Sequence, residues 1–220
     1  MRIAVLGTGM VGSTIGSKLV ELGHEVRMGS RDEQHEGATS WAAEAGERAS
    51  MGHFSDAAEF GEVLFNCTAG MHSVEALREA GEDNLKGKLL IDVANSLDSS
   101  RGMPPPLGIA NTESLGERIQ AAFPDARVVK ALNTINCEVM VDPGIVPGDH
   151  VIFVCGNDDD AKSETTRLLG ELGWSAERVM DLGDISQARG PEMYLPLWLR
   201  LMGSLDTTRF NIALRTAPPG

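Results

Sequence analysis

Three glycines near the start of the chain have the spacing that suits a phosphate-binding turn. Gly7, Gly9 and Gly12 form the pattern Gly-x-Gly-x-x-Gly. The first glycine permits a tight turn, the second lets a pyrophosphate approach the backbone, and the third lets a helix pack closely on a strand. Free N–H groups at the start of that helix favour an anion at the same place. The expected chemistry is the binding of a dinucleotide.

The segments around the glycines have the order that such a turn requires. Residues 3–6 are apolar, as in a strand buried on both faces, and residues 24–28 predict a second strand. Between them, apolar residues recur every three or four positions, which predicts a helix with one buried stripe. These residues are Val11, Ile15, Leu19 and Leu22. The alternative interpretation is a strand–helix–strand unit that binds no nucleotide.

The end of the second strand distinguishes between two dinucleotides. An acidic residue there binds the adenosine ribose of NAD(H) and repels a 2′-phosphate. This chain has Gly29, Ser30 and Arg31 instead, and their hydroxyl and guanidinium groups suit the 2′-phosphate of NADP(H). Asp32 keeps the other possibility open, because it could be the ribose acid of an NAD(H) site. The pattern favours NADP(H).

The rest of the chain alternates between predicted strands and helices. We expect strands at 63–67, 88–93, 126–132, 151–155 and 176–180, and helices from 39 onward and at 55–60, 72–80, 114–123 and 159–172, with a loop at 137–149. This alternation predicts an α/β fold of the Rossmann type, with a doubly wound, mainly parallel sheet. We expect residues 1–155 to form the NADP-binding domain. Residues 156–220 are expected to form a small helical region for substrate binding and dimerisation.

Small polar residues follow most of the predicted strands. In doubly wound sheets, ligands bind beyond the carboxyl ends of the strands, so these residues should converge on one extended cleft. They are Thr8, Ser30, Thr68, Gly70, Asn95, Ser96, Asn133 and Thr134. We also expect Ala69, between Thr68 and Gly70, to contact the cofactor.

The C-terminal segment is apolar on more than one side. Residues 185–214 predict one or two helices, and their apolar side chains include Tyr194, Leu197, Trp198 and Leu205. A helix of this kind is buried within a domain or between subunits. We therefore expect a homodimer in which residues 194–214 lie between the subunits.

The chain is acidic, with a net charge of −13 over 220 residues. This balance argues against nucleic acids and anionic membranes as partners. No apolar run approaches the length of a membrane span, and the three cysteines do not have metal-ligand spacing. We expect a cytoplasmic protein without a bound metal.

Several stretches resemble the family of F420-dependent NADP oxidoreductases, to which the N-terminal domains of membrane metalloreductases are also similar. They are residues 2–12, 22–26 with 29–31, 128–135, 154–160 and 181–184 with the apolar C-terminal segment. They cover nearly the whole chain in order. The resemblance implies direct hydride transfer between the nicotinamide C4 of NADP(H) and the C5 of the deazaflavin coenzyme F420.

The resemblance also implies roles for individual residues. Thr8, Gly9, Met10 and Val11 match the pyrophosphate loop, Ser30 and Arg31 the 2′-phosphate site, and Ala131, Asn133 and Thr134 the segment beside the nicotinamide. The chain departs from the family pattern at residues 67–72, in the loop 99–108 and at Asn133, where a histidine is common. These positions flank the second substrate.

Two side chains could take part in the chemistry itself. His72 could donate a proton to a substrate carbonyl, or only cap the following helix. Lys130 could point into the cleft or reach the surface. His35, His53 and His150 are expected to be solvated. Two other functions stay open. One is an NADPH-dependent reductase of an imine or small carbonyl, which would need a proton donor such as His72 and a pocket completed by the C-terminal helix of a partner. The other is a non-enzymatic NADP(H)-sensing module.

Overall fold

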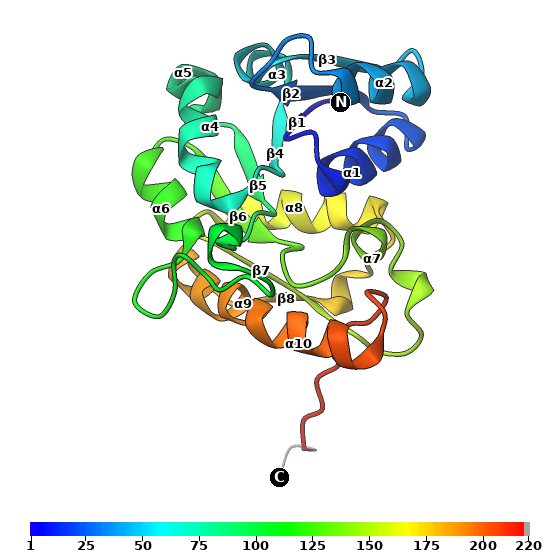
Figure 1. Cartoon of the computed structure of the whole chain (residues 1–220), viewed down its shortest axis with the longest axis vertical. Helices are drawn as coiled ribbons and strands as arrows, with labels where there is room; N and C mark the ends of the chain where they lie inside the picture. The colour runs from blue at the N-terminus through cyan, green and yellow to red at the C-terminus, as the bar shows by residue number, and fades with distance from the viewer. Residues whose placement is uncertain (218–220) are drawn as a thin grey trace.

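A computed structural model describes residues 1–217 and contains one eight-stranded sheet in the order β3-β2-β1-β4-β5-β6-β7-β8 (Figure 1). The strands are β1 (Arg2–Leu6), β2 (Glu25–Ser30), β3 (Ala49–His53), β4 (Val63–Asn66), β5 (Leu89–Asp92), β6 (Arg127–Ala131), β7 (Ile152–Gly156) and β8 (Val179–Asp181). Neighbouring strands are parallel except that β7 runs antiparallel to β6. The predicted Rossmann-type, mainly parallel sheet is confirmed.

Helices cover both faces of this sheet. They are α1 (Met10–Glu21), α2 (Glu36–Ala45), α3 (Phe54–Phe60), α4 (Ser73–Ala80), α5 (Glu82–Leu85), α6 (Leu115–Ala122), α7 (Cys137–Val141), α8 (Asp159–Glu171), α9 (Arg189–Met193) and α10 (Leu195–Leu205). The chain runs outward from β1 to β2 and β3, and then returns to the other side of β1 at β4. This reversal between β1 and β4 is where a doubly wound sheet opens a ligand crevice.

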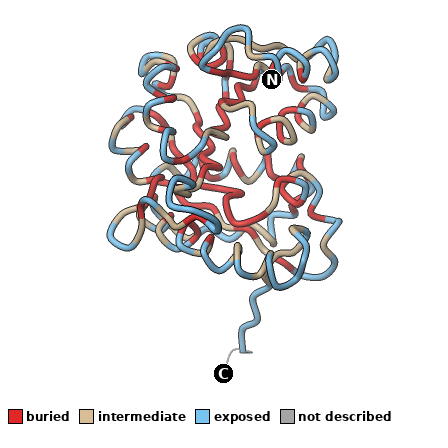
Figure 2. The backbone as a smooth tube through the Cα atoms, viewed as in Figure 1, coloured by how far each residue is buried: buried red, intermediate tan, exposed pale blue. Residues whose placement is uncertain are grey.

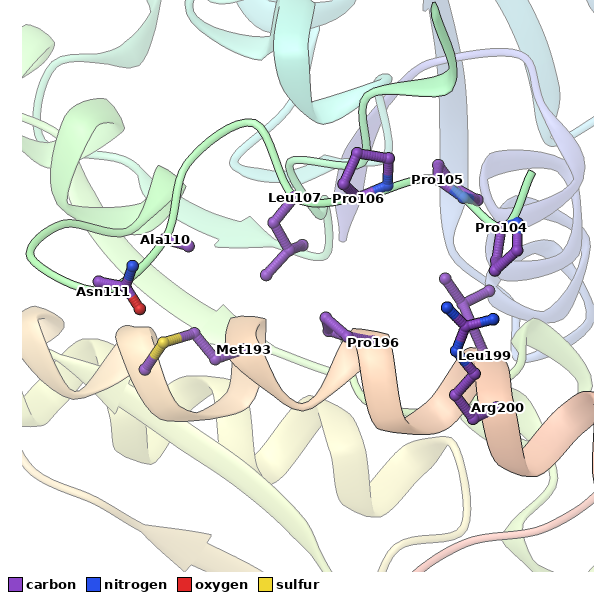
Figure 3. Close-up of a pocket in the computed structure, with 10 residues that line it drawn as sticks. All are labelled: Pro104, Pro105, Pro106, Leu107, Ala110, Asn111, Met193, Pro196, Leu199 and Arg200. Atoms are coloured by element: carbon purple, nitrogen blue, oxygen red, sulfur yellow. The ribbon is translucent and has the colours of Figure 1, made fainter. Parts of the chain in front are cut away.

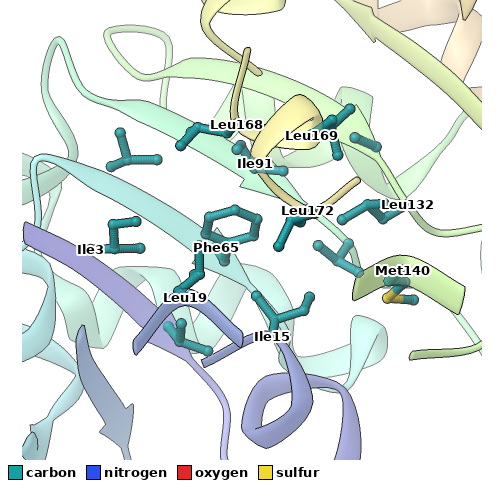
Figure 4. Close-up of a cluster of buried hydrophobic side chains, with 14 of the residues drawn as sticks. Ile3, Ile15, Leu19, Phe65, Ile91, Leu132, Met140, Leu168, Leu169 and Leu172 are labelled. Atoms are coloured by element: carbon teal, nitrogen blue, oxygen red, sulfur yellow. The ribbon is translucent and has the colours of Figure 1, made fainter. Parts of the chain in front are cut away.

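The core consists of two apolar layers, one on each face of the sheet. Ile3 and Val5 pack with Ile15 and Leu19 of α1 and with α8, as Figure 4 shows for several of these side chains. Ala4 and Leu6 point to the opposite layer, beneath α3, α4 and α6. Because successive residues of each central strand are buried on opposite faces, the strands contain continuous apolar runs. Figure 2 shows the buried strands enclosed by helices with exposed outer faces.

Three local predictions are corrected. The strand β3 was not expected, because Ala49–His53 is a half-buried edge strand with Ser and Gly rather than β-branched residues. The helix expected from residue 39 onward begins at Glu36, because His35 accepts a hydrogen bond from the Ala38 N–H and caps it. Part of the expected loop at 137–149 is helix α7, which Asn136 caps through the Glu138 N–H.

The C-terminal segment is less buried than its composition suggests. The helix α10 ends at Leu205, before Asp206 in a left-handed conformation, and only Leu195 of this helix is buried. Residues 206–217 are not helical. The sheet continues across residue 155, because β8 pairs with β7. Within residues 1–217, helices are too short or too polar to cross a membrane.

Candidate functional site

The glycine turn is built for close backbone contact. Gly7 has a φ of +118°, and a Cβ added to it would lie 2.5 Å from the Cys67 carbonyl oxygen. A Cβ on Gly12 would lie 2.1 Å from the Gly7 carbonyl oxygen, so α1 packs directly on the turn. A Cβ on Gly9 would meet nothing within 4 Å. Gly7 and Gly12 are therefore required by the fold, whereas Gly9 leaves open space above the start of α1.

The start of α1 suits a phosphate group. Gly9 is the N-cap of this helix and offers no side chain to its N–H groups, and the first turn contains no acidic residue. A twelve-residue helix adds the positive end of its dipole at this point. The open space over Gly9 together with these N–H groups fits the pyrophosphate of a dinucleotide.

A cavity of about 380 Å³ extends from the glycine turn towards the end of β2. Its lining includes Gly7, Thr8, Gly9, Ser30, Arg31, Asp32, His35, Cys67, Thr68, Ala69 and His72. The structure thus brings Thr8 and Gly9 of the predicted pyrophosphate loop to one cavity with the predicted 2′-phosphate residues Ser30 and Arg31, whereas Met10 is exposed and Val11 lies elsewhere. We refer to it as the outer cavity.

The polar groups at the end of β2 already have partners. The Ser30 hydroxyl donates to the Asp32 carbonyl oxygen and accepts from the Asp32 N–H at 3.1 Å. The Asp32 carboxylate accepts from the Gln34 N–H at 2.8 Å. The guanidinium of Arg31 is exposed and forms no ion pair within residues 1–217. Ser30 and Asp32 therefore shape the turn, and Arg31 is the cation available to a ligand.

His35 lies in the outer cavity, although its polar surroundings in the sequence led us to expect a solvated side chain. Its Nδ1 accepts from the Ala38 N–H at 3.2 Å, so the ring proton is on Nε2, which lies 3.4 Å from Thr8 Oγ1. His150 was also expected at the surface, but it is 2% exposed. Its ring packs against Trp174, and its Nε2 lies 3.1 Å from the Pro143 carbonyl oxygen.

A second cavity of about 300 Å³ lies beyond the ends of β4, β5 and β6, and we call it the inner cavity. Its lining includes Val11, Cys67, Thr68, Ala69, Gly70, Asn95, Leu97, Asn133, Ile135, Met140, Leu195 and Trp198. Cys67, Thr68 and Ala69 line both cavities, so the two adjoin along the loop after β4, and we call them together the cleft. Sequence reasoning did not identify Leu195 and Trp198 as site residues, because they come from α10.

Two asparagines join the exits of β5 and β6 in the inner cavity. Asn133 Nδ2 donates to Asn95 Oδ1 at 3.0 Å, and Asn95 Nδ2 donates to the Asn133 carbonyl oxygen at 2.8 Å. Ala131 and Thr134, which were expected beside the nicotinamide, are buried and do not line either cavity. Asn133 is thus the member of that segment that faces the cleft.

Neither candidate for chemistry lies in the inner cavity. The side chain of His72 is 72% exposed, lies 3.9 Å from Glu75, and lines the outer cavity. Lys130 is buried and paired with carboxylates. Cys67 does line the inner cavity, but burial, with the nearby Asp92 charge, raises the pKa of its thiol far above the usual range. Groups of His, Cys, Asp and Glu that could bind a metal do not occur within residues 1–217.

A third cavity, of about 480 Å³, lies between the loop of residues 104–111 and the helices α9 and α10. Pro104, Pro105 and Pro106 face Pro196, Leu199 and Arg200 of α10 across it (Figure 3). The helix α10 therefore contributes one set of side chains to this cavity and another set to the inner cavity. Its position determines the shape of both.

A Rossmann-type sheet with a phosphate-binding turn and a second cavity beside it is the arrangement expected of a dinucleotide-dependent oxidoreductase. The family profile described as "NADP oxidoreductase coenzyme F420-dependent" matches residues 2–96. The F420-dependent NADP reductase of Methanothermobacter marburgensis is 30% identical over 213 residues, which cover 91% of this chain and 92% of that protein. The chain belongs to this family and is an NADP-dependent oxidoreductase.

Two further comparisons agree with this assignment. The crystal structure of a candidate F420-dependent NADP reductase from Arthrobacter sp. FB24 superimposes with a TM-score of 0.93 and 49% identity, covering 98% of this chain and 100% of that one. Metalloreductase STEAP3 of Rattus norvegicus is 26% identical over 201 residues, or 90% of this chain. The chain spans only 38% of the length of that metalloreductase.

Proposed function

We propose that this protein transfers a hydride between NADP(H) and the deazaflavin coenzyme F420. The observation that carries the proposal is that the outer and inner cavities adjoin and share the lining residues Cys67, Thr68 and Ala69. A phosphate turn at one end and a cavity with amide and indole walls at the other suit two ring systems held together. The name of the family and of its F420-dependent members supports deazaflavin as the acceptor.

The outer cavity would hold the adenosine and phosphate groups of NADP(H). Gly9 and the first N–H groups of α1 would bind the pyrophosphate, as would the Thr8 hydroxyl, which lies beside His35 Nε2. Arg31 would pair with the 2′-phosphate as the free cation at the end of β2. Because the Nδ1 of His35 accepts a hydrogen bond from the Ala38 N–H, its ring proton is on Nε2 and points towards the Thr8 hydroxyl.

The inner cavity would align the reacting rings. Bound NADPH supplies the hydride, and the chain's own residues orient the acceptor and exclude water. The Asn95–Asn133 pair would hold the ring edge by its remaining N–H groups and by the Asn133 Oδ1, while Leu195 and Trp198 cover the opposite side. The one titratable group lining this cavity in residues 1–217 is Cys67, whose raised pKa keeps it protonated. Transfer between rings needs alignment more than acid–base groups, so this lining favours a deazaflavin over an imine or carbonyl substrate.

The test is stopped-flow NADPH oxidation with deazaflavin, flavin, quinone, imine and ketone acceptors compared side by side. We expect the fastest transfer to the deazaflavin, with deuterium from C4-labelled NADPH recovered in the acceptor. His72→Ala should reduce the rate less than about tenfold, since this side chain lies outside the inner cavity. Preferential reduction of an imine together with a loss of about 10²–10⁴-fold in His72→Ala would contradict the proposal.

We also propose a homodimer through α10. Leu197 and Leu205 of this helix are 55% and 53% exposed, which leaves an apolar strip in water. Light scattering at micromolar concentration should give twice the mass of the chain. A monomer at that concentration would rule the dimer out.

A further inference from the structure

Three charged side chains are buried together on the side of the sheet that faces α9. Lys130 Nζ lies 2.8 Å from Asp92 Oδ2 and 2.9 Å from Glu192 Oε1. The exposed fractions of the Lys130, Asp92 and Glu192 side chains are 1%, 0% and 1%. Lys130 also donates to the Ala94 carbonyl oxygen, so its three N–H groups have three acceptors. Such a cluster is costly to bury and is maintained only by complete pairing.

The Lys130 ammonium keeps its charge. Burial of the Lys130 ammonium disfavours its charge, but the Asp92 and Glu192 carboxylates outweigh this effect and raise the pKa of Lys130. Lys130 does not line any of the three cavities described above, so it cannot reach a substrate. The cluster must therefore act on the site through the segments that it joins.

On one side, the cluster is connected to the wall of the cleft at Thr68. Asp92 Oδ1 accepts from Asn66 Nδ2 at 2.8 Å, which directs the Asn66 Oδ1 towards the loop after β4. The Thr68 hydroxyl donates to that oxygen at 2.7 Å and therefore accepts from the Ser73 hydroxyl. These bonds fix the loop that lines both halves of the cleft.

On the other side, the cluster holds the start of α10. Glu192 accepts from the Leu115 N–H at 2.7 Å and from the Gly116 N–H at 3.0 Å, so it also ties α9 to the start of α6. Leu195 and Trp198, which line the inner cavity, follow Glu192 by three and six residues. Leu195, at the start of α10, is the buried residue of this helix, so the contacts near its start matter most for its position. Trp198, the fourth residue of the helix, also stacks on Phe210.

We propose that Asp92, Lys130 and Glu192 are positioning residues that set the spacing between the α10 wall and the Thr68 wall of the inner cavity. The proposal rests on the proposed function only in taking this cavity as the place of hydride transfer. Glu192 is the member to test, because it connects α10 to the cluster without touching the cofactor side of the cleft.

The experiment uses the full chain labelled with 5-fluorotryptophan and observed by ¹⁹F NMR. Trp41 provides an internal control: it donates to Ser17 Oγ and lies away from the inner cavity, whereas Trp174 donates to the carbonyl oxygen of Met140, which lines that cavity. In Glu192→Gln we expect the Trp198 signal to shift or broaden and the Trp41 signal to stay unchanged. The NADPH dissociation constant, from fluorescence titration, should stay within twofold. The single-turnover rate of hydride transfer to the deazaflavin should fall at least tenfold.

Two further variants make the test decisive. Glu192→Asp keeps the carboxyl group but is one methylene shorter, so it should move the Trp198 signal in the same way. If Glu192→Gln loses all three native tryptophan signals because it does not fold, Glu192→Asp provides the test of the positioning role. Arg189→Gln removes a partly exposed ion pair between α9 and Glu117, which does not include Lys130 or Asp92, and should leave the Trp198 signal and the rate unchanged. A folded Glu192 variant with wild-type transfer rate would overturn the proposal. If the wild type does not reduce the deazaflavin, the proposed acceptor is wrong. In that case the NMR spectra test the positioning role, and a Trp198 signal that does not move in the Glu192 variants would overturn it.

Discussion

Asn95 and Asn133 hydrogen-bond to each other across the ends of two neighbouring strands, with Asn133 Nδ2 donating to Asn95 Oδ1 at 3.0 Å. Asn95 returns a bond to the backbone oxygen of Asn133. The pair is thus rigid, and it leaves the Asn133 Oδ1 and one N–H of each amide for a ligand. A rigid pair of amides is suited to align a planar ring.

Asn133→Leu should lower turnover more than NADPH affinity. The substitution removes the bond to Asn95 and leaves the outer cavity intact, so phosphate contacts persist while ring alignment is lost. We expect turnover to fall about 10- to 100-fold. Steady-state kinetics combined with NADPH titration will separate the two effects. A variant that loses affinity and keeps its turnover would place Asn133 outside the reacting end of the cleft.

Gly9 and Gly12 provide a matched pair of substitutions. A Cβ at Gly9 would meet no other atom within 4 Å, and the Gly9 φ of −76° suits alanine, so Gly9→Ala should fold normally. The added methyl group should occupy the space of the pyrophosphate and weaken NADPH binding about tenfold or more. A Cβ at Gly12 would collide with the Gly7 carbonyl oxygen, so Gly12→Ala should destabilise the protein by about 1–3 kcal/mol. Thermal unfolding and NADPH titration of both variants test this. Normal NADPH affinity in Gly9→Ala would disprove the phosphate site.

Much of the fold could be predicted because its signals are local. The β1–α1–β2 unit lies within thirty residues, and central strands buried on both faces have apolar runs that stand out. The antiparallel direction of β7 could not be predicted, because an apolar run indicates a strand and not its direction. The edge strand β3 lacks such a run altogether.

The site was predictable only where strand ends determine it. Thr68, Asn95 and Asn133 follow strands and do converge. Trp198 could not be assigned, because its role depends on where α10 packs, and neither could the pairing of Lys130 with Glu192, 62 residues later in the chain. His35 was misjudged because its neighbours are polar, although it also caps α2.

The ion pair between Arg189 and Glu117 predicts a pH-dependent contribution to stability. Arg189 Nε donates to Glu117 Oε2 at 2.8 Å, and this bond is the main reason why the pKa of Glu117 is lowered. Burial acts in the opposite direction, and hydrogen bonds from the Ser114 hydroxyl and N–H lower the pKa further. A carboxyl group whose pKa is lowered by folding stabilises the protein fully above its unfolded pKa of about 4.3 and loses this contribution as the pH falls through the folded value.

Glu117→Gln should therefore reduce the free energy of unfolding by about 1 kcal/mol at pH 7, and the difference from wild type should shrink below about pH 4. Denaturant unfolding of both proteins at pH 7, 5 and 3 will measure it. A difference that is the same at all three values would mean that packing, and not the charge of Glu117, is responsible.

Arg31 should determine the preference for NADP(H). Arg31 lies at the end of β2 and forms no ion pair within residues 1–217, in a chain with a net charge of −13. The carboxylate of the neighbouring Asp32 already accepts a hydrogen bond from the Gln34 N–H. Arg31→Ala should weaken NADPH binding by about 1.5–3 kcal/mol, the loss expected for a charge-assisted bond to a phosphate, and should change NADH binding much less. Asp32→Asn is the matched control and should leave NADPH affinity unchanged or slightly improved.

Fluorescence titrations of both variants with NADPH and with NADH will distinguish an NADP(H) site from an NAD(H) site. Equal losses of NADPH and NADH in Arg31→Ala, or a loss of NADH binding in Asp32→Asn, would instead make Asp32 the ribose ligand of an NAD(H) site.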